Sequence, residues 1–170
     1  MKGKVVAVKE AVSLILRPIG TIETPFDDPK GMPIQPSGAV DIVGRVIVDP
    51  QYAEGLDDLE EFSHLILIYH FHRSEGYRLK VTPFMDTVER GLFSTRAPRR
   101  PNPVGLLVVR LLARTANILD IRGIDVLNGT PLLDIKPFVP VFDAPTAVRT
   151  GWLAAAQERA AERRSDGRFR

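Results

Sequence analysis

The chain has 170 residues, of which 44% are hydrophobic and 26% are charged, so it is long enough to bury the core of one domain. It contains no cysteine, which excludes a disulfide framework, a thiolate metal site and a cysteine nucleophile. The formal charge of +2 is too small to indicate a nucleic-acid partner by itself. We find no signal-peptide pattern and no apolar run near the ~18 residues of a membrane helix, and therefore expect a cytoplasmic protein without a membrane segment.

The first half of the chain predicts strands that are separated by turns and proline-rich loops. The strand signals are apolar runs and the alternation of apolar with polar residues. Pro18 interrupts the first strand or confines it to the edge of a sheet. Residues 24–38 hold four prolines and two glycines and are predicted to be a loop, and residues 52–61 a turn or short helix. The expected strands are residues 12–22, 38–48 and 62–72.

The second half predicts more strands and one helix. Asn128-Gly129 is the strongest two-residue hairpin signal, and the residues alone favour a plain type I′ turn there. Thr146 is predicted to cap a final helix through Trp152 to Glu162. The expected strands are residues 78–81, one that ends at Phe93, 104–112, 117–127 and 132–135. Many strands, tight turns and one helix indicate a mainly β fold, a single antiparallel barrel-like domain with a short C-terminal helix.

Residues 91–105 form the most unusual stretch of the chain. They contain three arginines and three prolines between two glycines, which excludes a helix and a buried strand. We expect a long, stiff loop that leaves one strand at Phe93 and enters another at Val104. Fixed cations on such a loop are suited to hold an anion or a negatively polarised ligand. The alternative interpretation is a basic surface loop that only connects two strands.

Three histidines, His64, His70 and His72, lie in the predicted strand 62–72, where a period of two places them on one face. His64 would lie roughly 20 Å from His70, so the three side chains cannot share one ion, and no metal site is predicted. His72, at the strand end, is the histidine expected to meet a ligand.

A second polar cluster lies between residues 125 and 136. Its members are residues 125, 128–130, 134 and 136. Asp134 and Lys136 share one face of a short strand, which indicates either an ion pair or the wall of a pocket. The familiar signatures of P-loop, Rossmann and α/β-hydrolase enzymes are missing from the sequence.

Four sequence blocks, read together, resemble the TsaA-like family, whose characterised members are TrmO-type tRNA methyltransferases. The blocks are Phe62-Ser63-His64-Leu65 with Phe71-His72, then T-R-A-P-R-R-P-N-P-V-G at 95–105, Asp125 with N-G-T-P at 128–131, and D-I-K-P-F at 134–138. Pro33-Ile34-Gln35 and Gly151-Trp152 resemble two further family segments. The resemblance covers residues 11–153, which leaves residues 1–10 as an N-terminal extension and 154–170 as a helical or disordered charged tail.

The resemblance implies a β-barrel that binds S-adenosyl-L-methionine, works as a homodimer and methylates N6 of threonylcarbamoyladenosine next to the anticodon of tRNA. It places the cofactor contacts at Pro33, Ile34, Gln35, Phe71, His72, Arg96, Leu106, Asn128, Gly129, Thr130 and Pro131. Under this interpretation the turn at 128–129 binds the cofactor.

Further roles are assigned by residue type. Asp134 is the expected general base, with Lys136 or Arg96 placing the carboxylate of the acceptor. Residues expected to contact the anticodon loop of tRNA are Arg99, Arg100 and Asn102.

Three positions depart from the family pattern: Ile34, Asn128 and Phe138 replace the usual arginine, aspartate and tyrosine. Better-studied bacterial members also carry an additional C-terminal domain. Two alternatives therefore stay open, a cofactor-binding regulatory module without tRNA methylation and methyl transfer to an acceptor other than RNA.

Overall fold

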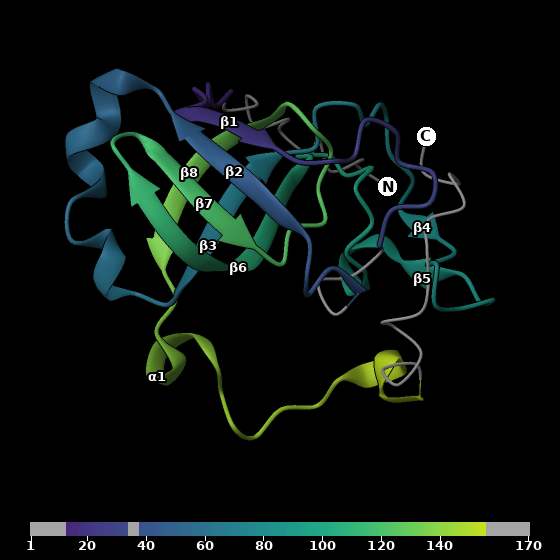
Figure 1. The fold of residues 1–170 in the computed structure, drawn as a ribbon. Helices are drawn as coiled ribbons and strands as arrows, with labels where there is room; N and C mark the ends of the chain where they lie inside the picture. The colour runs from purple at the N-terminus through teal and green to yellow at the C-terminus, as the bar shows by residue number, and fades with distance from the viewer. Residues whose placement is uncertain (1–12, 34–37, 156–170) are drawn as a thin grey trace, which may run out of the picture.

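The computed structural model describes residues 13–33 and 38–155, whose main feature is a closed antiparallel barrel of six strands (Figure 1). The strands follow one another around the barrel in the order β1-β2-β7-β6-β3-β8. Their bounds are β1 Gly20–Glu23, β2 Val43–Val48, β3 His64–His70, β6 Val104–Thr115, β7 Ile118–Arg122 and β8 Thr130–Pro137. The predicted mainly β, barrel-like fold is confirmed, and closure leaves no free sheet edge in this barrel.

Short elements surround the barrel. The segment between β3 and β6 carries a separate two-stranded sheet of β4 Lys80–Val81 and β5 Arg90–Gly91, which Figure 1 shows to one side of the barrel. The remaining elements are the 3-10 helices η2 Pro50–Leu56, η3 Leu59–Glu61, η4 Leu92–Ser94 and η5 Gly151–Ala155 and the α-helix α1 Pro140–Asp143. Within the described part, no helix is long and apolar enough to cross a bilayer.

Alternation along the strands fills the barrel interior. In β3, the side chains of Leu65, Leu67 and Tyr69 are buried, whereas the residues between them lie on the outer wall. Neighbouring strands contribute further buried aliphatic side chains in the same way, because successive residues of a strand point to opposite sides of the sheet. The core is therefore a layer of Leu, Ile and Val enclosed by the six strands.

β3 is shorter than predicted, since it ends at His70 rather than His72. The backbone N–H of His72 donates to the carbonyl of His70 (2.8 Å), which turns the chain out of the sheet. The expectation that all three histidines share one strand face is therefore wrong: only His64 and His70 lie in β3. No group of three or more potential metal-ligating side chains occurs among the residues that the structure describes.

The hairpin predicted at Asn128-Gly129 is also wrong. β7 ends at Arg122, and it pairs with β2 and β6, whereas β8 pairs with β1 and β3. Of the two turn residues only Gly129 has a positive φ (75°), whereas a type I′ turn needs two. The turn therefore carries the chain across the barrel end instead of joining neighbouring strands.

Other boundaries shift for local reasons. Residues 13–19 form no strand, because β1 begins only after Pro18, which has no N–H to donate. β2 begins at Val43, and β8 extends to Pro137 at the end of its ladder with β3. The predicted helix start at Thr146 is wrong, since residues 144–150 are irregular and η5 begins at Gly151.

Candidate functional site

One rim of the barrel gathers several of the predicted site residues. It is built by the ends of β1, β3 and β7 and the beginnings of β2, β6 and β8, as the strand registers show: His70 pairs with Val104, and Ile22 with Thr130. The loop at residues 24–33, residues 71–73, the loop at 95–103 and the turn at 123–129 all leave this rim. Segments far apart in the sequence therefore meet at one end of the barrel.

Asn128 holds the loop at residues 24–27 against the rim. Its backbone N–H donates to the carbonyl of Phe26 (2.7 Å), and its side-chain oxygen accepts the N–H of Thr24 (3.2 Å). Its amide nitrogen donates to a carboxylate oxygen of Asp27 (3.0 Å). An aspartate at position 128 would lack this donor and would place a second negative charge beside Asp27, which gives a physical reason for asparagine here.

Thr130 and His72 form a polar pair beside this turn. Thr130 is buried, and its hydroxyl donates to the carbonyl of Leu127 (2.7 Å). The Nδ1 atom of His72 lies 3.5 Å from the same hydroxyl oxygen, so a hydrogen bond there needs the proton on Nδ1 and leaves Nε2 as an acceptor. Burial, followed by the charge of Arg73, lowers the pKa of His72, which favours the neutral imidazole.

The aromatic rings of Phe71 and Tyr69 also belong to the site at this rim. Phe71 packs edge-on against Tyr69 with ring centroids 5.2 Å apart, and its N–H donates to the carbonyl of Pro103 (2.8 Å). Tyr69 is buried against Gly105, whose missing side chain leaves the space that the ring occupies. Burial, and then the negative charge of Asp125, raises the pKa of Tyr69, so its hydroxyl stays protonated.

Asp125 is the ionisable residue of the rim that the sequence-based site assignment left out. Burial raises its pKa to about 6, and its own backbone N–H and the charge of Arg96 oppose that rise only in part. Among the described residues, no cation lies within ion-pair distance of its carboxylate. The sequence signal for it is its place in the family block that joins Asp125 with N-G-T-P at 128–131.

A second group of predicted residues lies on the outer wall of the barrel. Leu106 is 53% exposed, and the strand registers place it in one row with Ile68 and Asp134 across β6, β3 and β8. Two strand spacings separate Leu106 from Asp134, about 10 Å. Asp134 and Lys136 form an ion pair (2.8 Å) that is about half exposed, which confirms the ion-pair interpretation of these two residues. Alternation along β8 also places Pro131 on the outside, next to the buried Thr130.

The arginine-rich loop has no regular structure between Thr95 and Pro103, as predicted. Arg96 is exposed, whereas Arg100 donates from one terminal nitrogen to the carbonyls of Thr95 (3.0 Å) and Ala97 (3.3 Å). The Nε atom of Arg99 is buried and has no hydrogen-bond partner in the described part of the chain. Asn102 is exposed, and its carbonyl accepts the N–H of Val104 (2.8 Å). The loop thus contains one braced and two less constrained arginines.

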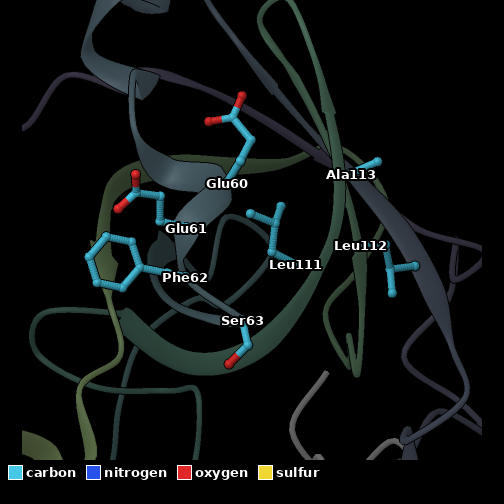
Figure 2. Close-up of a pocket in the computed structure, with 7 residues that line it drawn as sticks. All are labelled: Glu60, Glu61, Phe62, Ser63, Leu111, Leu112 and Ala113. Atoms are coloured by element: carbon cyan, nitrogen blue, oxygen red, sulfur yellow. The ribbon is translucent and has the colours of Figure 1, made fainter.

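The other predicted contacts lie in the loop before β2. Pro33 is buried, whereas Ile34 and Gln35 fall outside the described residues. The hollow of Figure 2 contains none of the predicted site residues. It is lined by Glu60, Glu61, Phe62, Ser63, Leu111, Leu112 and Ala113. These residues lie toward the opposite rim, where His64 pairs with Arg110, so this hollow is separate from the site at the rim.

Known proteins resemble this chain over most of its length. The family model of the tRNA-methyltransferase O N-terminal domain matches residues 21–144. This chain belongs to that family. A Pyrococcus abyssi protein named probable S-adenosyl-L-methionine-binding protein is 57% identical over 153 residues, which cover 90% of this chain and 83% of the relative. A human tRNA (adenine(37)-N6)-methyltransferase is 34% identical over 86% of this chain but only 35% of its own length.

Solved structures of family members share the fold. TrmO from Pseudomonas aeruginosa matches with a TM-score of 0.70 and 37% identity, over 83% of this chain and 63% of the solved chain. A second TrmO crystal structure matches with a TM-score of 0.71 and 40% identity, over 82% of this chain and 64% of that chain. This member of the tRNA-methyltransferase O N-terminal domain family therefore corresponds to about two thirds of those solved chains.

Proposed function

We propose that this protein is an S-adenosylmethionine-dependent methyltransferase that modifies N6 of threonylcarbamoyladenosine next to the anticodon of tRNA. Family membership supports the reaction class, and relatives named for the cofactor or for tRNA adenine methylation support the two substrates. The observation in this chain that carries the proposal is the half-buried carboxylate of Asp125, which has no ion-pair partner among the described residues, at the rim where several predicted contacts meet.

The residues of the rim fit this cofactor by their chemistry. S-Adenosylmethionine carries a sulfonium and an ammonium group, and a half-buried carboxylate without an ion-pair partner suits a positively charged ligand. Arg96 suits the cofactor carboxylate, and Phe71 offers an aromatic edge near the same rim. When bound, the cofactor supplies an electrophilic methyl carbon. We propose that the cofactor is held by the contacts that the family resemblance implies, together with Asp125.

The protein's own contribution is position and proton transfer. We propose that Asp134 removes the proton from N6 of the acceptor and that Lys136 or Arg96 orients the acceptor's carboxylate. The place of Asp134 on the outer wall supports this assignment because it lies in the same row as Leu106, a predicted cofactor contact two strands away. The ion pair with Lys136 keeps a cation next to the base before the acceptor arrives.

We also propose a cytoplasmic homodimer, in which the outer wall of β3 and β6 meets a second copy. Leu106 is exposed on this wall, and the half-buried Ile66, Ile68 and Val108 share its side of the sheet. A second copy would cover these apolar side chains and would close the outer side of the site. The contacts of Arg99, Arg100 and Asn102 with the anticodon loop belong to the same proposal.

A calorimetric titration tests the cofactor, and a transfer assay tests the reaction. We expect saturable binding of S-adenosylmethionine, weaker binding by Arg96→Ala and no binding of ATP as a control ligand. Radiolabelled methyl groups should then move to tRNA that carries threonylcarbamoyladenosine, and not to the same tRNA without this group. Cofactor binding without transfer to either tRNA would contradict the proposed reaction and support a regulatory cofactor-binding module, which the names of the archaeal relatives also allow.

Asp134→Asn tests the assignment of the base. The substitution keeps the shape of the side chain but removes its ability to accept a proton, so we expect turnover to fall roughly 100-fold or more while cofactor binding is unchanged. Single-turnover transfer at saturating cofactor measures this effect. The control is Asp120→Asn, which removes a carboxylate from the surface of β7. Full turnover by Asp134→Asn would exclude Asp134 as the base.

A further inference from the structure

Phe93 is a large apolar side chain on the protein surface. It lies in η4, directly after β5, and is 73% exposed. The guanidinium of Arg100 lies over its ring, 5.6 Å from the ring centroid, which is within cation–π distance. One face of the ring is thus next to a cation, while most of the ring remains accessible to solvent.

Two sets of contacts hold Arg100 and the backbone that carries Phe93 in place. Arg100 is fixed by its two hydrogen bonds to the carbonyls of Thr95 and Ala97. The backbone of η4 is braced by Trp152, whose indole N–H donates to the carbonyl of Ser94 (2.9 Å). Arg90 lies over the Trp152 ring at 5.6 Å. A flat partner can therefore bind Phe93 without first ordering the surface, which lowers the entropic cost of binding.

The charge around Phe93 favours a polyanion. Residues 77–100 contain six arginines and lysines but only two carboxylates, and one of these, Asp86, is paired with Arg90 (2.7 Å). Tyr77 and Leu79 in the same segment are also exposed. Exposed aromatic rings among arginines are the arrangement on which unpaired bases stack while cations contact phosphates. A duplex offers phosphates but no free base faces, so single-stranded RNA fits this surface better.

From this geometry we infer that Phe93 is the stacking platform for an unpaired base of the RNA substrate, with Arg100 on its other face. The inference rests on the proposed tRNA methylation, and it adds the surface that recognises the loop nucleotides. Phe93 lies three residues before Arg96, a predicted cofactor contact, in the same arginine-rich segment.

Phe93→Ala tests the inference by RNA binding rather than by catalysis. The probes are a stem-loop RNA with a seven-nucleotide loop and a fully paired RNA with the same number of phosphates, measured by fluorescence anisotropy over a salt series. We expect the variant to lose about 5- to 100-fold in affinity for the stem-loop and little for the duplex. The salt dependence should stay that of the wild type, because phenylalanine neutralises no phosphate. Phe93→Trp should retain stem-loop binding.

Phe142→Ala is the matched control. Phe142 is 80% exposed but lies in α1, which follows β8 and which Figure 1 shows well apart from the β4–β5 sheet, so its removal should leave RNA binding unchanged. The cofactor titration of Phe93→Ala should match the wild type. Wild-type stem-loop affinity in Phe93→Ala would overturn the inference and leave the proposed function standing.

Two other outcomes would also overturn the inference. If the wild-type protein binds neither RNA at low salt, the tRNA proposal falls together with the stacking platform. If Phe93→Ala changes the oligomeric mass in sedimentation and not the RNA affinity, the exposed ring belongs to a protein contact.

Discussion

Asp125→Asn is expected to stabilise the protein above neutral pH and to weaken the binding of S-adenosylmethionine. Burial raises the pKa of Asp125 from 3.8 to about 6, so at pH 8 the folded protein holds a largely desolvated negative charge at a cost of about 3 kcal/mol. Asparagine has nearly the same shape and carries no charge. Urea unfolding at pH 8 should therefore show a higher free energy of unfolding for the variant.

The pH dependence of this effect follows from the sign of the shift. Because the pKa is higher in the folded than in the unfolded chain, the folded state binds more protons between pH 3.8 and about 6, and the stability contributed by this group falls as the pH rises through that range. The advantage of Asp125→Asn should thus be largest above pH 6 and disappear near pH 4. Asp120→Asn is the control, since Asp120 is a partly exposed surface residue beside Arg45 (3.6 Å), and we expect a small effect that does not follow this profile.

Cofactor binding separates the functional from the structural role of Asp125. Wild-type affinity should fall as the pH drops through about 6, where the carboxylate becomes neutral. Asp125→Asn should bind weakly at every pH and lose this part of the profile. His72, whose pKa is lowered, also titrates on the acid side, and its contribution remains in the variant. A more stable variant with wild-type affinity would show that Asp125 does not face the cofactor, and a less stable variant at pH 8 would contradict the cost of the buried charge.

Gly105→Ala is expected to destabilise the barrel by about 1–3 kcal/mol, because it overpacks a position where the backbone meets an aromatic ring. A Cβ atom at residue 105 would fall on the ring of Tyr69, with the phenolic oxygen 2.7 Å away. The ring cannot move freely, since it is buried and packs against Phe71. Thermal and urea unfolding measure the loss, and cofactor binding should weaken as well because Phe71 rests on the displaced ring.

A control variant and a double variant test whether the contact between residue 105 and the Tyr69 ring causes this loss of stability. Gly55 in η2 has no atom within 4 Å of a built Cβ, so Gly55→Ala should change stability little. Tyr69→Leu removes the ring atoms that Gly105→Ala would meet, and the double variant should be more stable than the sum of the two single losses predicts. Equal stability of Gly105→Ala and the wild type would show that the ring moves aside at no cost.

The sequence predicted the elements whose causes are local. Apolar runs placed β3 and most of β6, because a short run of apolar residues bounded by turn signals is typical of a buried strand. Arginines and prolines excluded regular structure between Thr95 and Pro103, since proline removes donors and restricts its neighbours. The family blocks indicated the barrel. They also contain several of the residues that the structure brings together at the rim.

The error at Asn128-Gly129 originates in contacts between distant residues. Asn128-Gly129 has the local preference of a hairpin, but the turn is held by Thr24, Phe26 and Ile22, which are about a hundred residues away in the sequence. β3 ends at His70, which pairs with Val104 at the beginning of β6. Neither pattern nor propensity contains these partners.

The sequence by itself therefore determined the strand periodicity, the stiff basic loop and the family to which the chain belongs, since these depend on residue types at fixed spacing. Only the tertiary structure decided which residues share the rim and which lie on the outer wall. It brought Asp125, Tyr69 and Arg96 within electrostatic range and placed Leu106 and Asp134 in one row on the outer wall. The physical reason is closure of the barrel: the pairing of β8 with both β1 and β3 sets which side of the wall each residue faces and how much water reaches it.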